Sequence, residues 1–188
     1  MSRTIYLAFD SAIQRCLRVF ESGGVVALPT DTLYGVVTTI PNSDKLYRLK
    51  RRSYFKPLGL FIANTFEVQS NQLQKLLPGP VTLIFERSAV LPRDFNPNHS
   101  TVGIRIPDHD FIRSLALHLN DIPLAQTSAN ISNAQNNPLC IDDFTDLWPQ
   151  LDLIRPDGTL NYEGSTVVNL SIPGTFSIVR DGWYVYLI

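Results

Sequence analysis

Residues 11–35, SAIQRCLRVFESGGVVALPTDTLYG, combine a helical pattern, a glycine turn and an apolar run. Apolar residues at helical spacing predict a helix over residues 11–21, with Cys16 in its buried face and Gly23-Gly24 at its end. The apolar run 25–28 predicts a buried strand, which stops where polar residues begin. A helix, a glycine turn and a buried strand in this order are typical of an α/β domain.

The same alternation of helices and strands continues along the chain. Periodicity and turn residues predict further helices over 43–51, 73–77, 108–119 and 141–148. Short apolar runs predict strands over 58–63, 81–85, 102–106, 123–125, 167–170 and 176–179. We therefore expect one α/β domain over residues 1–188, with a twisted, mixed, open sheet flanked by helices.

The composition excludes several classes of protein. With 188 residues, 44% of them hydrophobic and 18% charged, the chain is neither disordered nor a membrane protein. A net charge of −1 argues against a surface that is basic throughout and binds nucleic acid. Two cysteines cannot form a disulfide framework, and the N-terminus has no signal- or transit-peptide pattern. We expect a soluble, cytoplasmic protein without a membrane span, and leave a mitochondrial location open.

Several common catalytic motifs are absent from the sequence. It has no phosphate-binding G-x-x-x-x-G-K-[ST] loop, no G-x-G-x-x-G and no G-x-S-x-G. Its three histidines are scattered, so we predict no metal site built from protein ligands. If the chain is an enzyme, we expect it to work by positioning and charge neutralisation rather than through a covalent intermediate.

Two polar segments in the first third of the chain are candidate binding loops. Segment 28–35 places hydroxyls and an acid directly after a strand, where α/β sheets bind ligands, although a capped turn would look the same. Segment 50–58 holds Lys50, Arg52 and Lys56, which could converge on a triphosphate where the helix ends. Cations that complement a helix C-terminus are the alternative.

Two later segments add polar groups at strand ends. Arg105 lies in the apolar strand of segment 100–107 and needs a partner, either a structural acid or a carboxylate ligand. Segment 125–132 runs from a short strand into small hydroxyl and amide residues, which suit phosphate or ribose but also form ordinary turns.

Six segments, in order and in register, resemble the YrdC/TsaC family of threonylcarbamoyl-AMP synthases, and they are most similar to the animal YrdC-domain proteins. They are PTDTLYG at 29–35, KRRSYFKPL at 50–58, LPGPVTL at 77–83, VGIRIP at 102–107, TSANIS at 127–132 and GSTVVN at 164–169. The resemblance spans residues 22–182. The chain departs from the family pattern at Ser53 and Asp181, where the family usually has proline.

The resemblance implies a fold and a reaction. The fold is the YrdC/RibB-like α/β domain with a large, concave, positively charged cavity. The reaction is a nucleotidyl transfer in which L-threonine, bicarbonate and ATP give threonylcarbamoyl-AMP and pyrophosphate, for the t6A modification of tRNA. Mg²⁺ would arrive with ATP, and a tRNA threonylcarbamoyl-transferase complex would receive the product. We expect binding of tRNA itself to be weak or absent.

Positional matching with the family also implies roles for individual residues. The threonine contacts would be Thr30, Lys56, Arg105 and Ser165. The catalytic clamp on the triphosphate would be Lys50 and Arg52. The remaining ATP contacts would be Thr101, Ser128, Asn130 and Arg180.

Two rival functions belong to other classes. A nucleic-acid-binding module would use the same basic concavity to hold RNA phosphates, and a regulatory domain would bind the nucleotide without turnover. Against the first, Arg105 lies in an apolar strand rather than on an exposed basic face. Against the second, Lys50, Arg52 and Ser128 are all present.

Overall fold

Nine strands form a single mixed sheet in the computed structural model, which describes residues 9–63, 75–120, 122–132, 136–160 and 163–183. The strand order is β7-β1-β2-β6-β3-β5-β4-β8-β9. The bounds are β1 Val26–Leu28, β2 Gly35–Thr39, β3 Gly59–Phe61, β4 Val81–Glu86, β5 Thr101–Arg105, β6 Leu124–Ser128, β7 Leu153–Ile154, β8 Thr166–Asn169 and β9 Ser177–Arg180. Three pairs are parallel, β1 with β7, β3 with β5 and β4 with β8, and the other pairs are antiparallel.

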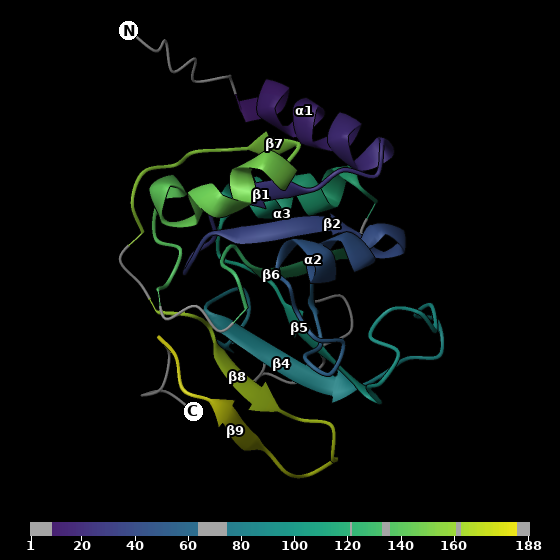
Figure 1. The fold of residues 1–188 in the computed structure, drawn as a ribbon. Coiled ribbons are helices and arrows are strands. Elements are labelled where there is room, and N and C mark those ends of the chain that lie inside the picture. Colours follow the sequence, from purple (N-terminus) through teal and green to yellow (C-terminus); the bar gives the residue numbers. More distant parts are fainter. Residues whose placement is uncertain (1–8, 64–74, 121, 133–135, 161–162, 184–188) are drawn as a thin grey trace, which may run out of the picture.

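Helices cover both faces of the sheet. α1 (Phe9–Glu21) and α3 (Asp110–His118) pack against each other over one face (Figure 1). The other face packs against α2 (Asp44–Leu49) and the 3₁₀ segment η3 (Ile141–Gln150). Strand residues alternate between these two layers: Val36 of β2 joins the α2 layer, whereas Val37 joins the α1 layer.

The turn after α1 fixes how the first strand enters the sheet. Gly23 has a φ of +73°, a conformation that glycine adopts without strain. Its N–H donates to the Phe20 carbonyl at 2.9 Å, and the Gly24 N–H donates to the Val19 carbonyl at 2.7 Å, as in a Schellman motif. This cap ends the helix and directs the chain into β1.

The structure confirms the predicted α/β class and the open, mixed sheet flanked by helices. Cys16 lies in the core, and burial raises the pKa of its thiol to about 11. Strands β2 and β7 were not predicted, and the helix predicted over 141–148 is 3₁₀ with a kink at Phe144. Of the helix predicted over 73–77, residues 73 and 74 lie outside the described residues, and Leu76 and Leu77 lie in turns and bends.

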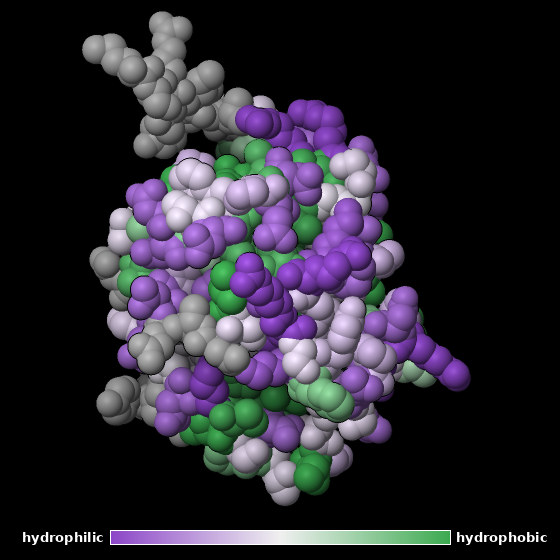
Figure 2. All heavy atoms as spheres, viewed as in Figure 1, coloured by the Kyte–Doolittle hydropathy of each residue, from purple (hydrophilic) through white to green (hydrophobic). Residues whose placement is uncertain are grey.

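The sheet ends in an edge strand that carries exposed apolar residues. Figure 2 shows hydrophobic side chains reaching the surface at the β8–β9 end of the molecule. Phe176 and Val179 in this region are 62% and 60% exposed. Across the described ranges, no helix combines the length and the apolar character that a membrane crossing requires.

Candidate active site

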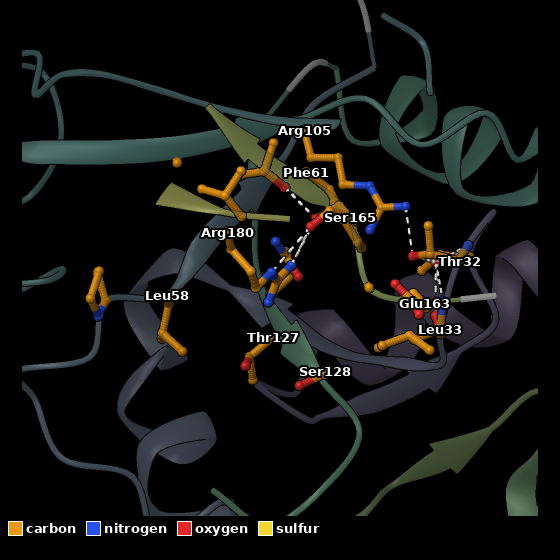
Figure 3. A pocket seen from close by; sticks show the side chains of 18 of the residues that line it. Thr32, Leu33, Leu58, Phe61, Arg105, Thr127, Ser128, Glu163, Ser165 and Arg180 are labelled. Carbon is orange, nitrogen blue, oxygen red and sulfur yellow. Dashed lines mark hydrogen bonds between the residues drawn. The ribbon is translucent and has the colours of Figure 1, made fainter. Parts of the chain in front are cut away.

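A cavity of about 550 Å³ lies against the polar ends of the central strands. Its walls come from the loop between β1 and β2, from β4, β5, β6 and β8, and from the chain around β9 (Figure 3). Thr101, Gly103 and Arg105 all line it because alternate residues of a strand face the same side of the sheet. A cavity of this volume is within the range that binds small ligands and cofactors.

Three guanidinium groups face this cavity. Arg52, Arg105 and Arg180 all line it, together with the carboxylates of Glu163 and Asp181. Desolvation lowers the pKa of each arginine, and the charge of Arg180 lowers the pKa of Arg52 and of Arg105 further. An anion bound between these guanidinium groups would offset their mutual repulsion, so the arrangement suits a polyanionic ligand.

The Arg180 side chain is held by Ser165. Its Nη2 donates to the Ser165 carbonyl at 2.6 Å and to the Ser165 hydroxyl at 3.2 Å (Figure 3). The Ser165 hydroxyl also lies 2.8 Å from the hydroxyl of Thr82 on β4. Gly182 follows Arg180 by two residues and lies so close to Gly164 that a Cβ at position 182 would overlap the Gly164 carbonyl oxygen. Gly182 therefore allows the C-terminal strand to bring Arg180 to the cavity.

Arg105 forms an ion pair with a carboxylate of the protein, that of Asp31. Its Nη2 forms an ion pair with Asp31 Oδ1 at 2.5 Å and donates to the Thr32 hydroxyl at 2.8 Å (Figure 3 shows the bond to Thr32). The Arg105 side chain is 7% exposed, and its Nε is buried without a hydrogen-bond partner among the described residues. The second carboxylate oxygen of Asp31 accepts the backbone N–H of Asp108 at 3.1 Å.

Thr30 organises the turn that carries Asp31. The Thr30 hydroxyl accepts the backbone N–H groups of Thr32 at 3.0 Å and Leu33 at 3.2 Å, and donates to the Leu33 carbonyl at 2.7 Å. These bonds are those of the capped turn that the sequence allowed, and Thr30 nevertheless lines the cavity.

Lys50 lies behind the cavity wall rather than in it. The residue is 1% exposed. Its ammonium group donates to the Ser128 carbonyl at 2.5 Å, the Ser128 hydroxyl at 3.1 Å and Asn130 Oδ1 at 2.9 Å. Burial and the nearby charge of Arg52 lower the pKa of Lys50 to about 7. Ser128 and Asn130 do line the cavity, so Lys50 contacts residues of the wall without lining the cavity itself.

The remaining bases of this segment do not converge as the sequence suggested they could. The Arg52 guanidinium donates from Nε to the Lys56 carbonyl and from Nη2 to the Pro57 carbonyl, both at 2.9 Å. Lys56 itself is exposed and does not line the cavity, whereas Arg52 does. The reason is geometric: α2 ends at Leu49, Arg51 takes a positive φ of 49°, and the loop that follows turns Arg52 but not Lys56 toward the cavity.

Eight of the ten sequence-predicted site residues line the cavity. They are Thr30, Arg52, Thr101, Arg105, Ser128, Asn130, Ser165 and Arg180. Sequence reasoning missed Thr32, Thr127, Glu163 and Asp181, which also line it. Each of these four is a chain neighbour, within two positions, of a residue that was identified, so proximity along the chain was the available signal.

Among the described residues, the donor groups of the site do not form a metal cluster. Within the residues that the structure describes, no group of three or more histidines, cysteines, aspartates or glutamates could hold a metal ion. Two carboxylates, Glu163 and Asp181, line the cavity. This donor set fits Mg²⁺ that is carried in on a triphosphate, because that ion keeps waters and phosphate oxygens and takes only one or two carboxylates.

Comparisons with known proteins agree on one family. The family model for Sua5, YciO and YrdC, described as telomere recombination, matches residues 18–182. A human protein named threonylcarbamoyl-AMP synthase is 44% identical over 192 aligned residues, which cover 93% of this chain and 68% of the human protein.

Solved structures of the same family share the fold. The crystal structure of Pyrococcus abyssi Sua5 complexed with L-threonine is 26% identical, with a TM-score of 0.81. The match covers 92% of this chain and 54% of that chain, so this chain spans about half the length of that protein. Escherichia coli YciO is 23% identical with a TM-score of 0.81, over 92% of this chain and 89% of the other.

Proposed function

Because the chain belongs to the Sua5/YciO/YrdC family, we propose that it is a threonylcarbamoyl-AMP synthase. In this reaction L-threonine, bicarbonate and ATP give threonylcarbamoyl-AMP, pyrophosphate and water. The observation that carries the proposal is the arrangement of Arg52, Arg105 and Arg180 around one cavity whose walls also offer hydroxyl and amide groups. The L-threonine complex of Pyrococcus abyssi Sua5 supports the choice of amino acid.

We assign the triphosphate to the side of the cavity formed by Arg52 and Arg180. These two guanidinium groups repel each other in the free protein, and a bound triphosphate would neutralise both. Thr101, Ser128 and Asn130 line the same cavity and would bind the nucleotide through hydroxyl and amide groups. Mg²⁺ enters as part of the ATP substrate, with Glu163 and Asp181 within the cavity wall as its available carboxylates.

We assign threonine to the side of the cavity formed by Thr30, Arg105 and Ser165. Arg105 is fixed there by Asp31, so its charge is held in place before the amino acid binds. Lys56 stays a proposed threonine or carbamate contact, and it would have to approach the cavity from the exposed loop.

The chemistry needs orientation and charge neutralisation more than acid–base catalysis. The amine of threonine takes up carbon dioxide derived from bicarbonate, and a carbamate oxygen then attacks the α-phosphorus of ATP. The bond between the α-phosphorus and the oxygen that bridges it to the β-phosphorus breaks, and pyrophosphate leaves with that oxygen. Arg52, supported by Lys50 behind the wall, would draw negative charge off the leaving group.

The experiment that tests this function is an assay of pyrophosphate release from ATP without tRNA. We expect release to require both threonine and bicarbonate, because the nucleophile forms only from the two together. Release that ignores threonine would contradict the proposal. Strong RNA binding without any threonine-dependent release would favour the nucleic-acid-binding alternative, and nucleotide binding without turnover would favour the regulatory one.

The product and the compartment complete the proposal. Threonylcarbamoyl-AMP would pass to a tRNA threonylcarbamoyl-transferase complex, which installs the t6A modification. Both cysteines, Cys16 and Cys140, are free, which suits a reducing compartment such as the cytoplasm.

A further inference from the structure

Asn96 is a buried polar residue outside the cavity whose side chain clamps a distant segment of backbone. It is 0% exposed and has a φ of 47°, in the loop between β4 and β5. The Leu58 N–H donates to Asn96 Oδ1 at 2.9 Å, and Asn96 Nδ2 donates to the Leu58 carbonyl at 2.9 Å. The amide thus binds both backbone groups of Leu58, as a neighbouring strand would.

The same amide also holds the helix at the other end of the Arg52 loop. Asn96 Oδ1 accepts the Tyr47 hydroxyl at 2.7 Å, and Tyr47 belongs to α2. The Tyr47 carbonyl in turn accepts the backbone N–H of Arg52 at 2.8 Å. One side chain therefore ties together the two segments, α2 and the start of β3, between which the loop carries Arg52.

The Arg52 guanidinium depends on this loop for its position. It donates to the carbonyls of Lys56 and Pro57, the two residues directly before Leu58. A shift of Leu58 would therefore move both acceptors that aim Arg52 at the cavity.

The loop that carries Asn96 is itself well anchored. The Arg87 guanidinium donates to the Phe95 carbonyl at 2.5 Å and also to the Pro92 carbonyl. Phe95 is buried in the core. A second contact joins the two loops, since a His99 ring nitrogen lies 3.3 Å from the Tyr54 carbonyl. Asn96 thus connects the anchored loop between β4 and β5 to the more exposed loop that carries Arg52.

We propose that Asn96 is a positioning residue that holds Arg52 in its triphosphate-binding geometry. The inference rests on the proposed function, because it takes Arg52 as a triphosphate contact. Removing the amide should free Leu58 and misplace the guanidinium, which would weaken its charge-assisted hydrogen bonds to the triphosphate. We expect ATP affinity to fall by about ten- to a hundredfold, and threonine affinity to change by less than about threefold.

The test is a calorimetric measurement of Mg·ATP and threonine affinities in four proteins: wild type, Asn96→Gly, Arg52→Ala and the double variant. Glycine accepts the positive φ of Asn96, so the variant loses the amide and its Cβ without adding backbone strain. If Asn96 acts through Arg52, the double variant should bind ATP no more weakly than Arg52→Ala alone. The matched control is Thr38→Val, which removes a buried hydrogen bond to the Gly24 carbonyl away from the cavity and should leave both affinities unchanged.

Several outcomes would overturn the inference. One is an unchanged ATP affinity in a folded Asn96→Gly protein. Another is that Asn96→Gly lowers ATP affinity by the same factor in the Arg52→Ala protein as in wild type. If Asn96→Gly does not fold, Asn96→Asp decides the question, since it keeps the size and the acceptor oxygen but replaces the donor to the Leu58 carbonyl. A wild-type protein that binds no ATP would overturn the proposed function and this inference with it.

Discussion

The ammonium nitrogen of Lys50 lies 2.9 Å from Oδ1 of Asn130, across 80 positions of the sequence. The contact joins the end of α2 to the loop after β6, two of the segments that the family resemblance singled out. It places the buried amino group of Lys50 against the polar wall of the cavity, because its partners Ser128 and Asn130 line that wall.

The depressed pKa of Lys50 predicts how stability changes with pH. The pKa falls from an ordinary value of 10.5 to about 7 in the folded protein, so between these values the unfolded chain binds more protons. The free energy of unfolding should therefore rise with pH across this window, by on the order of a few kcal/mol from this group. Urea denaturation of wild type and Lys50→Met at several pH values measures the difference. Cys16 titrates in both proteins and cancels. Parallel pH profiles for the two proteins would contradict the assignment.

Replacing Arg52 with alanine should lower turnover by about 10²–10³-fold while the fold survives. The change removes a charge that would stabilise the leaving pyrophosphate, which we expect to be worth about 3–4 kcal/mol in the transition state. Pyrophosphate release and circular dichroism check activity and fold. The control is Arg48→Ala, which removes an exposed arginine of α2 that forms a surface ion pair with Asp44. Normal release by a folded Arg52→Ala protein would refute the role.

Arg105→Lys should raise the threonine requirement more than the ATP requirement. A single nitrogen, Nη2, binds Asp31 and Thr32, and lysine keeps the charge but loses the planar two-nitrogen fork that would bind the threonine carboxylate. Calorimetric titration of threonine and ATP into the variant separates the two effects. If threonine affinity is unchanged while stability falls, Arg105 is a structural partner of Asp31 and not a substrate contact.

Gly182→Ala should weaken ATP binding by displacing Arg180. Its new Cβ would lie 2.6 Å from the Ser165 carbonyl carbon and the Thr166 nitrogen, so the strand that carries Arg180 must move. We expect a loss of stability of about 1–3 kcal/mol and weaker ATP binding. Gly174→Asn is the control: it lies beyond β8, its Cβ would meet nothing within 4 Å, and asparagine tolerates the positive φ. Equal ATP affinity in the Gly182→Ala and Gly174→Asn proteins would show that Arg180 needs no such support.

The rate of pyrophosphate formation should not depend on tRNA. The adenylate is complete before tRNA is needed, so adding tRNA should leave the initial rate nearly unchanged. Serine should replace threonine poorly, by about 10–200-fold, because it lacks one methyl contact. Initial rates with threonine, serine and added tRNA test both points. Nanomolar RNA binding at physiological salt, without threonine-dependent release, would instead assign the cavity to RNA.

The local pattern of the sequence determined most of the fold. The helical spacing before Gly23 and the apolar run after Gly24 predicted α1 and β1, because local periodicity and a glycine turn need no distant partner. β2 was missed because Gly35 and two threonines make it look like a loop. That strand is stabilised by its pairing with β1 and β6 rather than by its own composition.

The residue types of the site were also readable from the sequence, whereas their partners were not. Arg105 clearly needed a counter-charge, but only the pairing of strands far apart in the chain brought Asp31 within 2.5 Å of it. Lys50 and Arg52 looked equivalent in the sequence, yet tertiary packing buried one behind the wall and turned the other into the cavity. The sequence shows which charged residues a site can hold, because residue type is a property of each position by itself. The direction of each charge depends on long-range contacts such as those of Asn96 and Asn130, which only the folded chain provides.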